Sequence, residues 1–116
     1  MLLNLSNHPS AAWSSAQVQA AIKSYGSIED MPFPPIDPKA DESAIQELAI
    51  IYLEKIRDIN PNAVHIMGEL TFTFELVRLL QTHGITCIAS TTHRSTIELE
   101  DGTKNVKFEF VRFRAY

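Results

Sequence analysis

Short apolar runs alternate with amphipathic stretches along most of this chain, and that alternation constrains its fold more than any other feature. The apolar runs cover residues 2–6, 63–67 and 85–89, and each is followed by polar residues or by glycine. A weaker run lies at 27–31. Strands that alternate with helices are typical of parallel sheets, because each crossover helix returns the chain to the same end of the sheet. The sequence therefore predicts an α/β fold with a mostly parallel sheet flanked by helices.

The stretches between these runs have helical periodicity. The clearest helix should begin after Asp41 or Ser43, which would cap it, and one face is apolar at helical spacing: Ile45, Leu48, Ala49, Tyr52, Leu53 and Ile56. A helix is also expected from Ser14 or Ser15 to Gly26, and another over residues 69–83. The proline-rich segment 32–38 predicts a stiff connection, because proline lacks the backbone N–H that a helix or central strand needs.

The period of the pattern changes near the C-terminus. Apolar residues alternate with polar ones on both sides of Asp101-Gly102, a favoured pair for a two-residue type I′ turn. This pattern predicts a C-terminal antiparallel β-hairpin with one buried face. With a two-residue turn, the register would place Arg94 opposite Glu109 as a cross-strand ion pair.

Composition narrows the class of protein. The 116 residues fit a single domain spanning 1–116, and the net charge of −4 argues against a partner such as long nucleic acid, which needs a basic surface. The single cysteine, Cys87, excludes a disulfide framework and favours a reducing compartment. No apolar stretch is long enough to span a membrane, and the N-terminus does not resemble a signal peptide. We therefore expect a cytoplasmic protein with no membrane partner.

Polar residues gather where the predicted first, third and fourth strands end. Because ligands of open parallel sheets bind at the carboxyl ends of the strands, these segments predict one binding site. The candidate binding residues share hydroxyl, amide, carboxylate or backbone hydrogen-bonding groups: Ser6, Asn7, Ser10, Gly68, Glu69, Thr71, Ser90, Thr91 and Thr92. Gly68 would let a ligand approach the backbone, unless it only permits the turn. Glu69 would bind a hydroxyl or an amine, or would cap the next helix. The hydroxyls at 90–92 would hold phosphate or a purine edge, or would only mark a polar strand end.

Candidate catalytic residues are His8, His93 and Arg94. Either histidine could serve as acid or base near neutral pH, and Arg94 could neutralise a phosphate or pair with Glu109. Two histidines without a third ligand give no case for a metal. His65 lies in mid-strand and reads as a satisfied core histidine. Trp13 would stack on a base or anchor the first helix.

The sequence lacks the motifs of several enzyme classes. There is no G-x-G-x-x-G after the first strand, no P-loop, no C-x-x-C, no H-E-x-x-H and no G-x-S-x-G. The sequence therefore gives little support to a dinucleotide-dependent oxidoreductase or a nucleoside triphosphatase, and no cofactor is expected.

A resemblance to a known group rests on three short motifs. The opening Leu2-Asn4-Leu5-Ser6-Asn7-His8-Pro9, the turn Met67-Gly68-Glu69-x-Thr71 and the segment Ser90-Thr91-Thr92-x-Arg94 resemble small CRISPR-associated proteins with a CARF-like, Rossmann-like fold. Those proteins are similar to ring nucleases and other binders of cyclic oligoadenylate.

The resemblance implies a homodimer that holds the ligand, most readily cyclic tetra-adenylate, across its two-fold axis. It also implies metal-independent cleavage, in which a ribose 2′-hydroxyl attacks its own phosphate and ends type III CRISPR signalling in antiviral defence. His8 or His93 would then be acid or base, and Arg94 would stabilise charge. The lysine or serine expected of a catalytic site has no definite counterpart, because the lysines lie away from these motifs. A non-catalytic binder, a sponge or sensor, therefore remains an alternative, as does an interaction domain without a ligand.

Overall fold

A computed structural model describes all residues from Met1 to Tyr116. Its strands are β1 (Leu2–Ser6), β2 (Ile28–Pro32), β3 (Ala63–Met67), β4 (Thr86–Glu98) and β5 (Lys104–Ala115); its helices are α1 (Ser15–Tyr25), α2 (Glu42–Ile59) and α3 (Leu70–Thr82). They form one sheet of five strands in the order β2-β1-β3-β4-β5. β1 to β4 are parallel, and β5 runs antiparallel to β4. The predicted α/β class, the mostly parallel sheet and the C-terminal antiparallel hairpin are confirmed.

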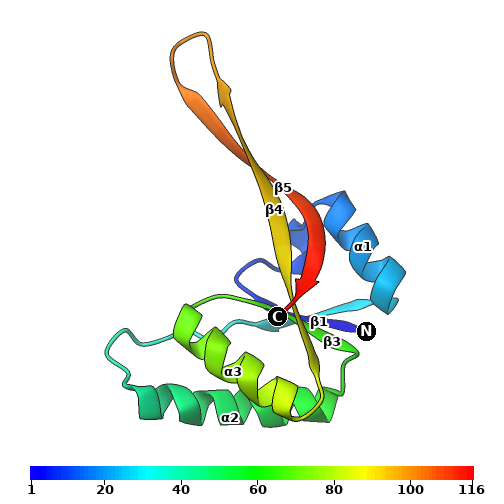
Figure 1. Cartoon of the computed structure of the whole chain (residues 1–116), viewed down its shortest axis with the longest axis vertical. Helices are drawn as coiled ribbons and strands as arrows, with labels where there is room; N and C mark the ends of the chain where they lie inside the picture. Colours follow the sequence, from blue (N-terminus) through cyan, green and yellow to red (C-terminus); the bar gives the residue numbers. More distant parts are fainter.

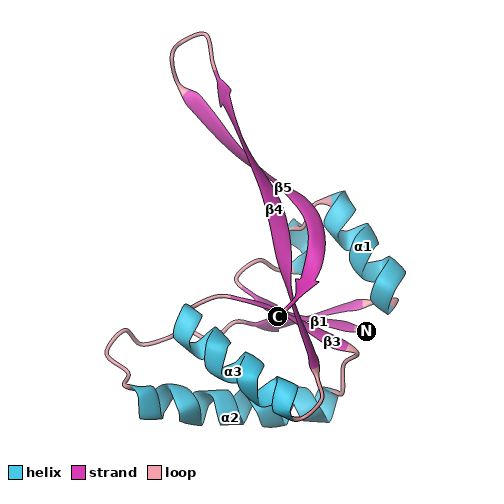
Figure 2. Cartoon of the chain, in the orientation of Figure 1, coloured by secondary structure: helices cyan, strands magenta, loops and turns pink.

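The helices cover both faces of the sheet (Figures 1 and 2). α2 and α3 pack side by side on one face, where they bury Leu3, Leu5, Val64, Ile66 and Cys87 of the strands. α1 lies on the opposite face, over a smaller cluster formed by Leu2, Ala21, Ala63 and Ile88. Since successive strand residues face opposite sides, Asn4, Ser6 and His65 share the α1 face with Leu2 and Ala63. The smaller helical layer therefore covers the polar side of the sheet.

Side chains at the helix starts explain where the helices begin. The Ser14 hydroxyl accepts from the Gln17 N–H before α1, and the Asp41 carboxylate accepts from the Ala44 N–H before α2. These caps agree with the predicted starts, since each satisfies a backbone donor that the helix leaves free. No helix of the structure combines the length and the apolar character that a bilayer crossing requires.

The C-terminal hairpin projects from the domain as an arm (Figure 1). The predicted strand at 85–89 was too short, because β4 continues to Glu98 with β5 paired along it. The predicted buried face is also wrong: Phe108 is 64% exposed and Val106 45%, because no helix covers the arm.

The predicted register of the arm is wrong by one residue. Arg94 pairs with Phe108, and His93 pairs with Glu109. The turn is longer than two residues, because Leu99 N–H donates to Thr103 O and Gly102 takes a positive φ of 84°. This geometry is a turn with a glycine bulge, which adds a residue to the loop and shifts every cross-strand pair.

β4 separates from β3 soon after it enters the sheet. Their pairing ends at His65 and Ile88, whereas β1 pairs with β3 as far as Ser6 and Met67. A register shift between Thr91 and Thr92 then bends the β4–β5 pair. Beyond His65, β3 has no strand partner on the side of β4; the Ile66 carbonyl oxygen accepts from the Tyr116 hydroxyl, and the Ser90 N–H donates to Met67 Sδ.

Candidate functional site

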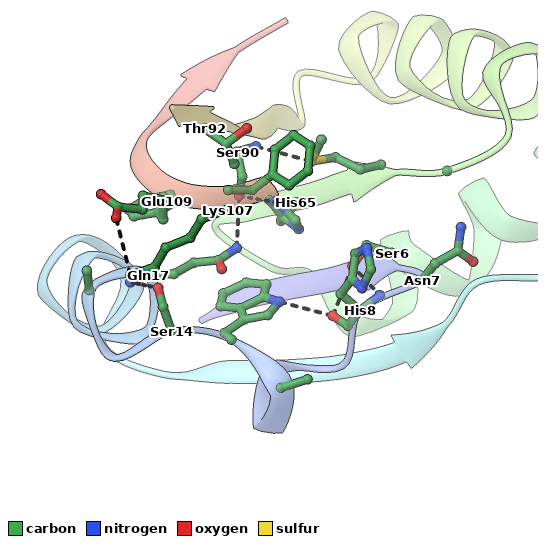
Figure 3. Close-up of a pocket in the computed structure, with 17 residues that line it drawn as sticks. Ser6, Asn7, His8, Ser14, Gln17, His65, Ser90, Thr92, Lys107 and Glu109 are labelled. Carbon is green, nitrogen blue, oxygen red and sulfur yellow. Dashed lines mark hydrogen bonds and ion pairs between the residues drawn. The ribbon is translucent and has the colours of Figure 1, made fainter. Parts of the chain in front are cut away.

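A cleft of about 1050 Å³ lies at the carboxyl ends of β1 and β3, between α1 and the base of the arm (Figure 3). β1 leads to β2 on one side of the sheet, and β3 leads to β4 on the other side. The strand order therefore reverses between β1 and β3, where open α/β sheets bind ligands. The cleft occupies the place that the sequence predicts for a binding site.

Six of the predicted site residues line this cleft. They come from the end of β1 and its loop, from the turn after β3 and from within β4: Ser6, Asn7, His8, Gly68, Ser90 and Thr92. Segments far apart in the sequence therefore meet at one rim, as expected from the parallel sheet.

The other predicted binding residues have partners elsewhere. Ser10 donates from its hydroxyl and its N–H to Asp30, and the Thr91 hydroxyl bonds to the Arg112 backbone. The Glu69 carboxylate caps α3 by accepting from the Phe72 and Thr71 N–H groups, which holds the Glu69 pKa below its ordinary value. The capping interpretation of Glu69 is thus the one that its contacts support.

Three further predicted residues lie outside the cleft. The Thr71 hydroxyl donates to Glu69, and Thr71 lines a separate depression of about 380 Å³ beside α2. His93 and Arg94 lie on the arm, where both are exposed. Of the predicted catalytic residues, only His8 lines the cleft.

A row of polar side chains crosses the sheet beside the cleft. Asp30, Asn4 and His65 occupy matching positions of β2, β1 and β3. Asn4 and His65 are only 1% and 2% exposed. Asn4 Nδ2 donates to Asp30 Oδ1 at 2.9 Å and to the His8 carbonyl oxygen at 2.9 Å. The row therefore joins the outer strand to the centre of the sheet through hydrogen bonds.

This row determines which nitrogen of His65 carries the proton. Because Asn4 Nδ2 faces two acceptors, Asn4 Oδ1 must face His65 Nδ1, which lies 2.9 Å away. An amide oxygen only accepts, so His65 Nδ1 holds the ring proton. His65 Nε2 then accepts from the Ser90 hydroxyl, whose Oγ lies 2.7 Å away. Ser90 Oγ in turn accepts from Gln17 Nε2 at 2.9 Å (Figure 3).

The surroundings of His65 keep its ring neutral. Burial, together with the nearby His8, lowers the pKa of His65 from 6.5 to about 4. Its ring lies edge-on to Trp13, with centroids 5.0 Å apart, and to Phe113, with centroids 5.7 Å apart. These aromatic rings exclude water from the imidazole, so a neutral acceptor nitrogen faces Ser90 at neutral pH.

The outer wall of the cleft consists of aromatic and charged side chains. Trp13, Phe108 and Phe110 supply aromatic surface. Lys107 and Glu109 come from β5 and form an ion pair at 3.4 Å that is exposed to solvent. The Trp13 Nε1–H donates to the His8 carbonyl oxygen, so the same loop positions both side chains. The cleft thus combines flat apolar surfaces with a cation and several hydroxyls.

Comparison with models of known protein families assigns the chain to a family. Residues 1–114 match the model of the uncharacterized protein MJ1673 family. The chain belongs to the MJ1673 family. A comparison of this MJ1673-family protein with curated proteins gave no match.

Gly68 of this MJ1673-family protein is required by packing. A Cβ built on Gly68 would lie 2.2 Å from the ring of Phe33, in the proline-rich connection between β2 and α2. That ring packs edge-on against Phe72 of α3. The glycine therefore lets Phe33 cover the backbone of the β3–α3 turn, and a ligand is not needed to explain it.

The prediction that His65 is a satisfied core histidine is confirmed, but sequence reasoning missed that it links Asn4 to Ser90. His65 is buried and fully hydrogen-bonded, but one of its partners, Ser90, lines the cleft. Polar residues at matching central positions of predicted parallel strands, Asn4 and His65, were the available signal in this MJ1673-family sequence.

Proposed function

We propose that the cleft binds a cyclic oligoadenylate, most readily cyclic tetra-adenylate, and opens the ring to end a type III CRISPR signal. The observation that carries this proposal is the cleft itself, which gathers Asn7, Gly68 and Ser90 at the switch point of the sheet. The motifs that resemble CARF-like proteins supply the identity of the ligand.

The size and lining of the cleft suit this ligand. Its volume of about 1050 Å³ lies at the upper end of the range for small-molecule sites. Trp13, Phe108 and Phe110 offer faces for adenine, since base stacking on aromatic rings is favourable. Lys107 offers charge to a phosphate, which would compete with its solvent-exposed ion pair to Glu109. The same lining argues against a long duplex, because the chain as a whole is acidic.

The topology supports a Rossmann-like fold of the CARF-like type. The order β2-β1-β3-β4 with helices on both faces is that of doubly wound α/β domains, which bind ligands between β1 and β3. The single domain would act in the cytoplasm, where its one cysteine, a buried thiol, stays reduced.

His8 remains the proposed acid–base histidine. It lies on the loop after β1, and its ring is exposed along the cleft wall (Figure 3). His93 and Arg94 lie on the arm outside the cleft of their own chain. Their position favours a second candidate function, a sponge or sensor that binds the ring without cutting it.

A homodimer is part of the proposal. The arm exposes large apolar side chains, among them Ile97, Val106 and Val111, and a second copy would cover them. The mass of the protein in solution, measured by light scattering, should be that of two chains. A monomer at every concentration would contradict the dimer and leave the cleft unaffected.

The test of the function is incubation with cyclic tetra-adenylate in the presence of a chelator. Internal attack of a 2′-hydroxyl gives a linear product with a 2′,3′-cyclic phosphate and the same mass as the substrate, so chromatography must separate them. Linear product supports the nuclease. Binding without product supports the sponge. Neither binding nor product overturns both.

A further inference from the structure

The Ser90 hydroxyl stands between a buried imidazole and the cleft. Its proton faces His65 Nε2 at an oxygen–nitrogen distance of 2.7 Å, because the other ring nitrogen is already protonated. Among the hydroxyls that line the cleft, those of Ser6 and Ser14 bond to backbone or amide groups. Ser90 alone bonds to an imidazole nitrogen.

This arrangement has the three parts of an activated hydroxyl. A serine donates to a neutral histidine, and a third group orients the ring through its far nitrogen. Here the third group is the Asn4 amide, which is held by the Asp30 carboxylate. Hydrogen bonds from Asn4 and Ser10 outweigh the burial that would raise the Asp30 pKa, so its carboxylate stays ionised and keeps the amide in place.

We propose that Ser90 and His65, oriented by Asn4, are the proton-accepting pair of the cleft, with Ser90 Oγ in contact with the reacting hydroxyl of the ligand. This inference rests on the proposed ring-opening activity. It replaces His93, which lies on the arm, as the base. Ser90 and His65 are catalytic residues in this scheme, and Asn4 is a positioning residue.

The step balances without a cofactor. The ribose 2′-oxygen forms a bond to phosphorus, and the bond from phosphorus to the 5′-oxygen breaks. The 2′-hydroxyl proton passes to Ser90 Oγ as the Ser90 proton passes to His65 Nε2. The leaving 5′-oxygen takes a proton from His8, the proposed general acid, on the loop along the same cleft. Solvent then returns both histidines to their starting forms.

Two histidines with different environments suit opposite roles. His65 is buried between aromatic rings and neutral, whereas His8 is exposed. Burial and the nearby His8 both lower the pKa of His65, so its ring rests neutral and Nε2 is left as an acceptor for the Ser90 hydroxyl. The other charges at the cleft, Lys107 and Glu109, pair with each other.

The first test compares Ser90→Ala and His65→Gln with Ser95→Ala, a control farther along β4 on the arm. The rate of ring opening should fall by about 100-fold or more in the first two, as expected for loss of a general base. Affinity for cyclic tetra-adenylate, read from Trp13 fluorescence, should change far less. Ring opening at the wild-type rate in Ser90→Ala or His65→Gln would overturn the assignment.

The second test is independent of the ligand. Phenylmethanesulfonyl fluoride should modify Ser90: a bond forms from Oγ to sulfur, fluoride leaves, and the proton passes to His65 Nε2. Mass mapping should find the adduct on Ser90 in the wild type and lose it in His65→Gln. If the protein opens no ring, the proposed nuclease fails, and this labelling alone decides the pair. An unlabelled Ser90 would then overturn it.

Nitrogen NMR of the His65 ring tests the role of Asn4. In the wild type, Nδ1 should carry the proton and Nε2 should not. In the folded variant, Asn4→Ala should allow the proton onto Nε2, because the acceptor that faces Nδ1 is gone. A protonated Nε2 in the neutral ring of the wild type would overturn the proposal.

Discussion

Asn4 Oδ1 lies 2.9 Å from His65 Nδ1, and the two residues are register partners on neighbouring strands. This contact couples the loop after β1 to the centre of the sheet, because the same amide also holds the His8 carbonyl and Asp30. A single side chain thus contacts two residues that line the cleft, His8 and His65.

Replacing Asn4 with alanine should destabilise the fold strongly. The change leaves His65 Nδ1–H without a partner and removes one hydrogen bond each from the His8 carbonyl and Asp30, at a residue that is 1% exposed. We expect a loss of about 3 kcal/mol in the free energy of unfolding, measured in urea. Gln19→Ala on exposed α1, whose amide bonds only to Ser15, should change it by less than about 0.5 kcal/mol. Equal effects would contradict the structural role of the row.

Stability should depend on pH through His65. Its pKa is about 4 in the fold and 6.5 as the ordinary value, so the unfolded chain binds a proton first as the pH falls. The stabilisation is complete above pH 6.5 and is lost between 6.5 and about 4, by about 3 kcal/mol in total. Urea unfolding at pH 7 and pH 5 measures most of it.

The matched variants for this pH effect are His65→Gln and His83→Gln. His65→Gln should flatten the dependence between pH 7 and 5, whereas His83→Gln, at an exposed helix end, should keep it. Asp30 and Glu69, whose pKa values are lowered, should lose their contributions at lower pH. If the unfolding free energy of His65→Gln changed with pH as in the wild type, the effect would arise from other groups.

Gly68→Ala should destabilise the protein through Phe33. The new methyl group would meet the Phe33 ring at 2.2 Å, and overpacking of this kind costs about 1–3 kcal/mol. Phe33→Leu should recover part of that cost, which a double-mutant cycle in urea would measure. Gly84→Ala, at a φ of 74° with open space around it, should show no coupling to Phe33. Additive effects of the Gly68 and Phe33 substitutions would mean that the Phe33 ring is not the reason why position 68 requires glycine.

Cys87 should be inert in the folded protein. It is 2% exposed, and burial raises the pKa of its thiol to about 11. A thiol-reactive disulfide reagent at neutral pH should therefore modify it only after unfolding in urea. Rapid modification in native buffer would show that the α3 face opens readily.

Sequence periodicity predicted the helices, the parallel strands and the rim where Ser6, Gly68 and Ser90 meet, because each signal is local or follows from parallel pairing. The arm could not be predicted in the same way. Its apolar alternation is typical of a buried face, yet no helix lies over Phe108. The register of Arg94 depended on one extra loop residue at Gly102. The partnership of Ser90 with His65 depended on where β4 leaves β3, which is a tertiary property.

The most direct test of the central claim is a fluorescence titration with cyclic tetra-adenylate. Trp13 is the only tryptophan of the chain and lies in the wall of the cleft, so its emission reports on that site alone. We predict a saturable change in Trp13 emission, together with a rise in thermal stability as the ligand exceeds its dissociation constant. Emission and melting temperature that both stay constant at high ligand concentration would contradict cyclic oligoadenylate as the ligand of this cleft.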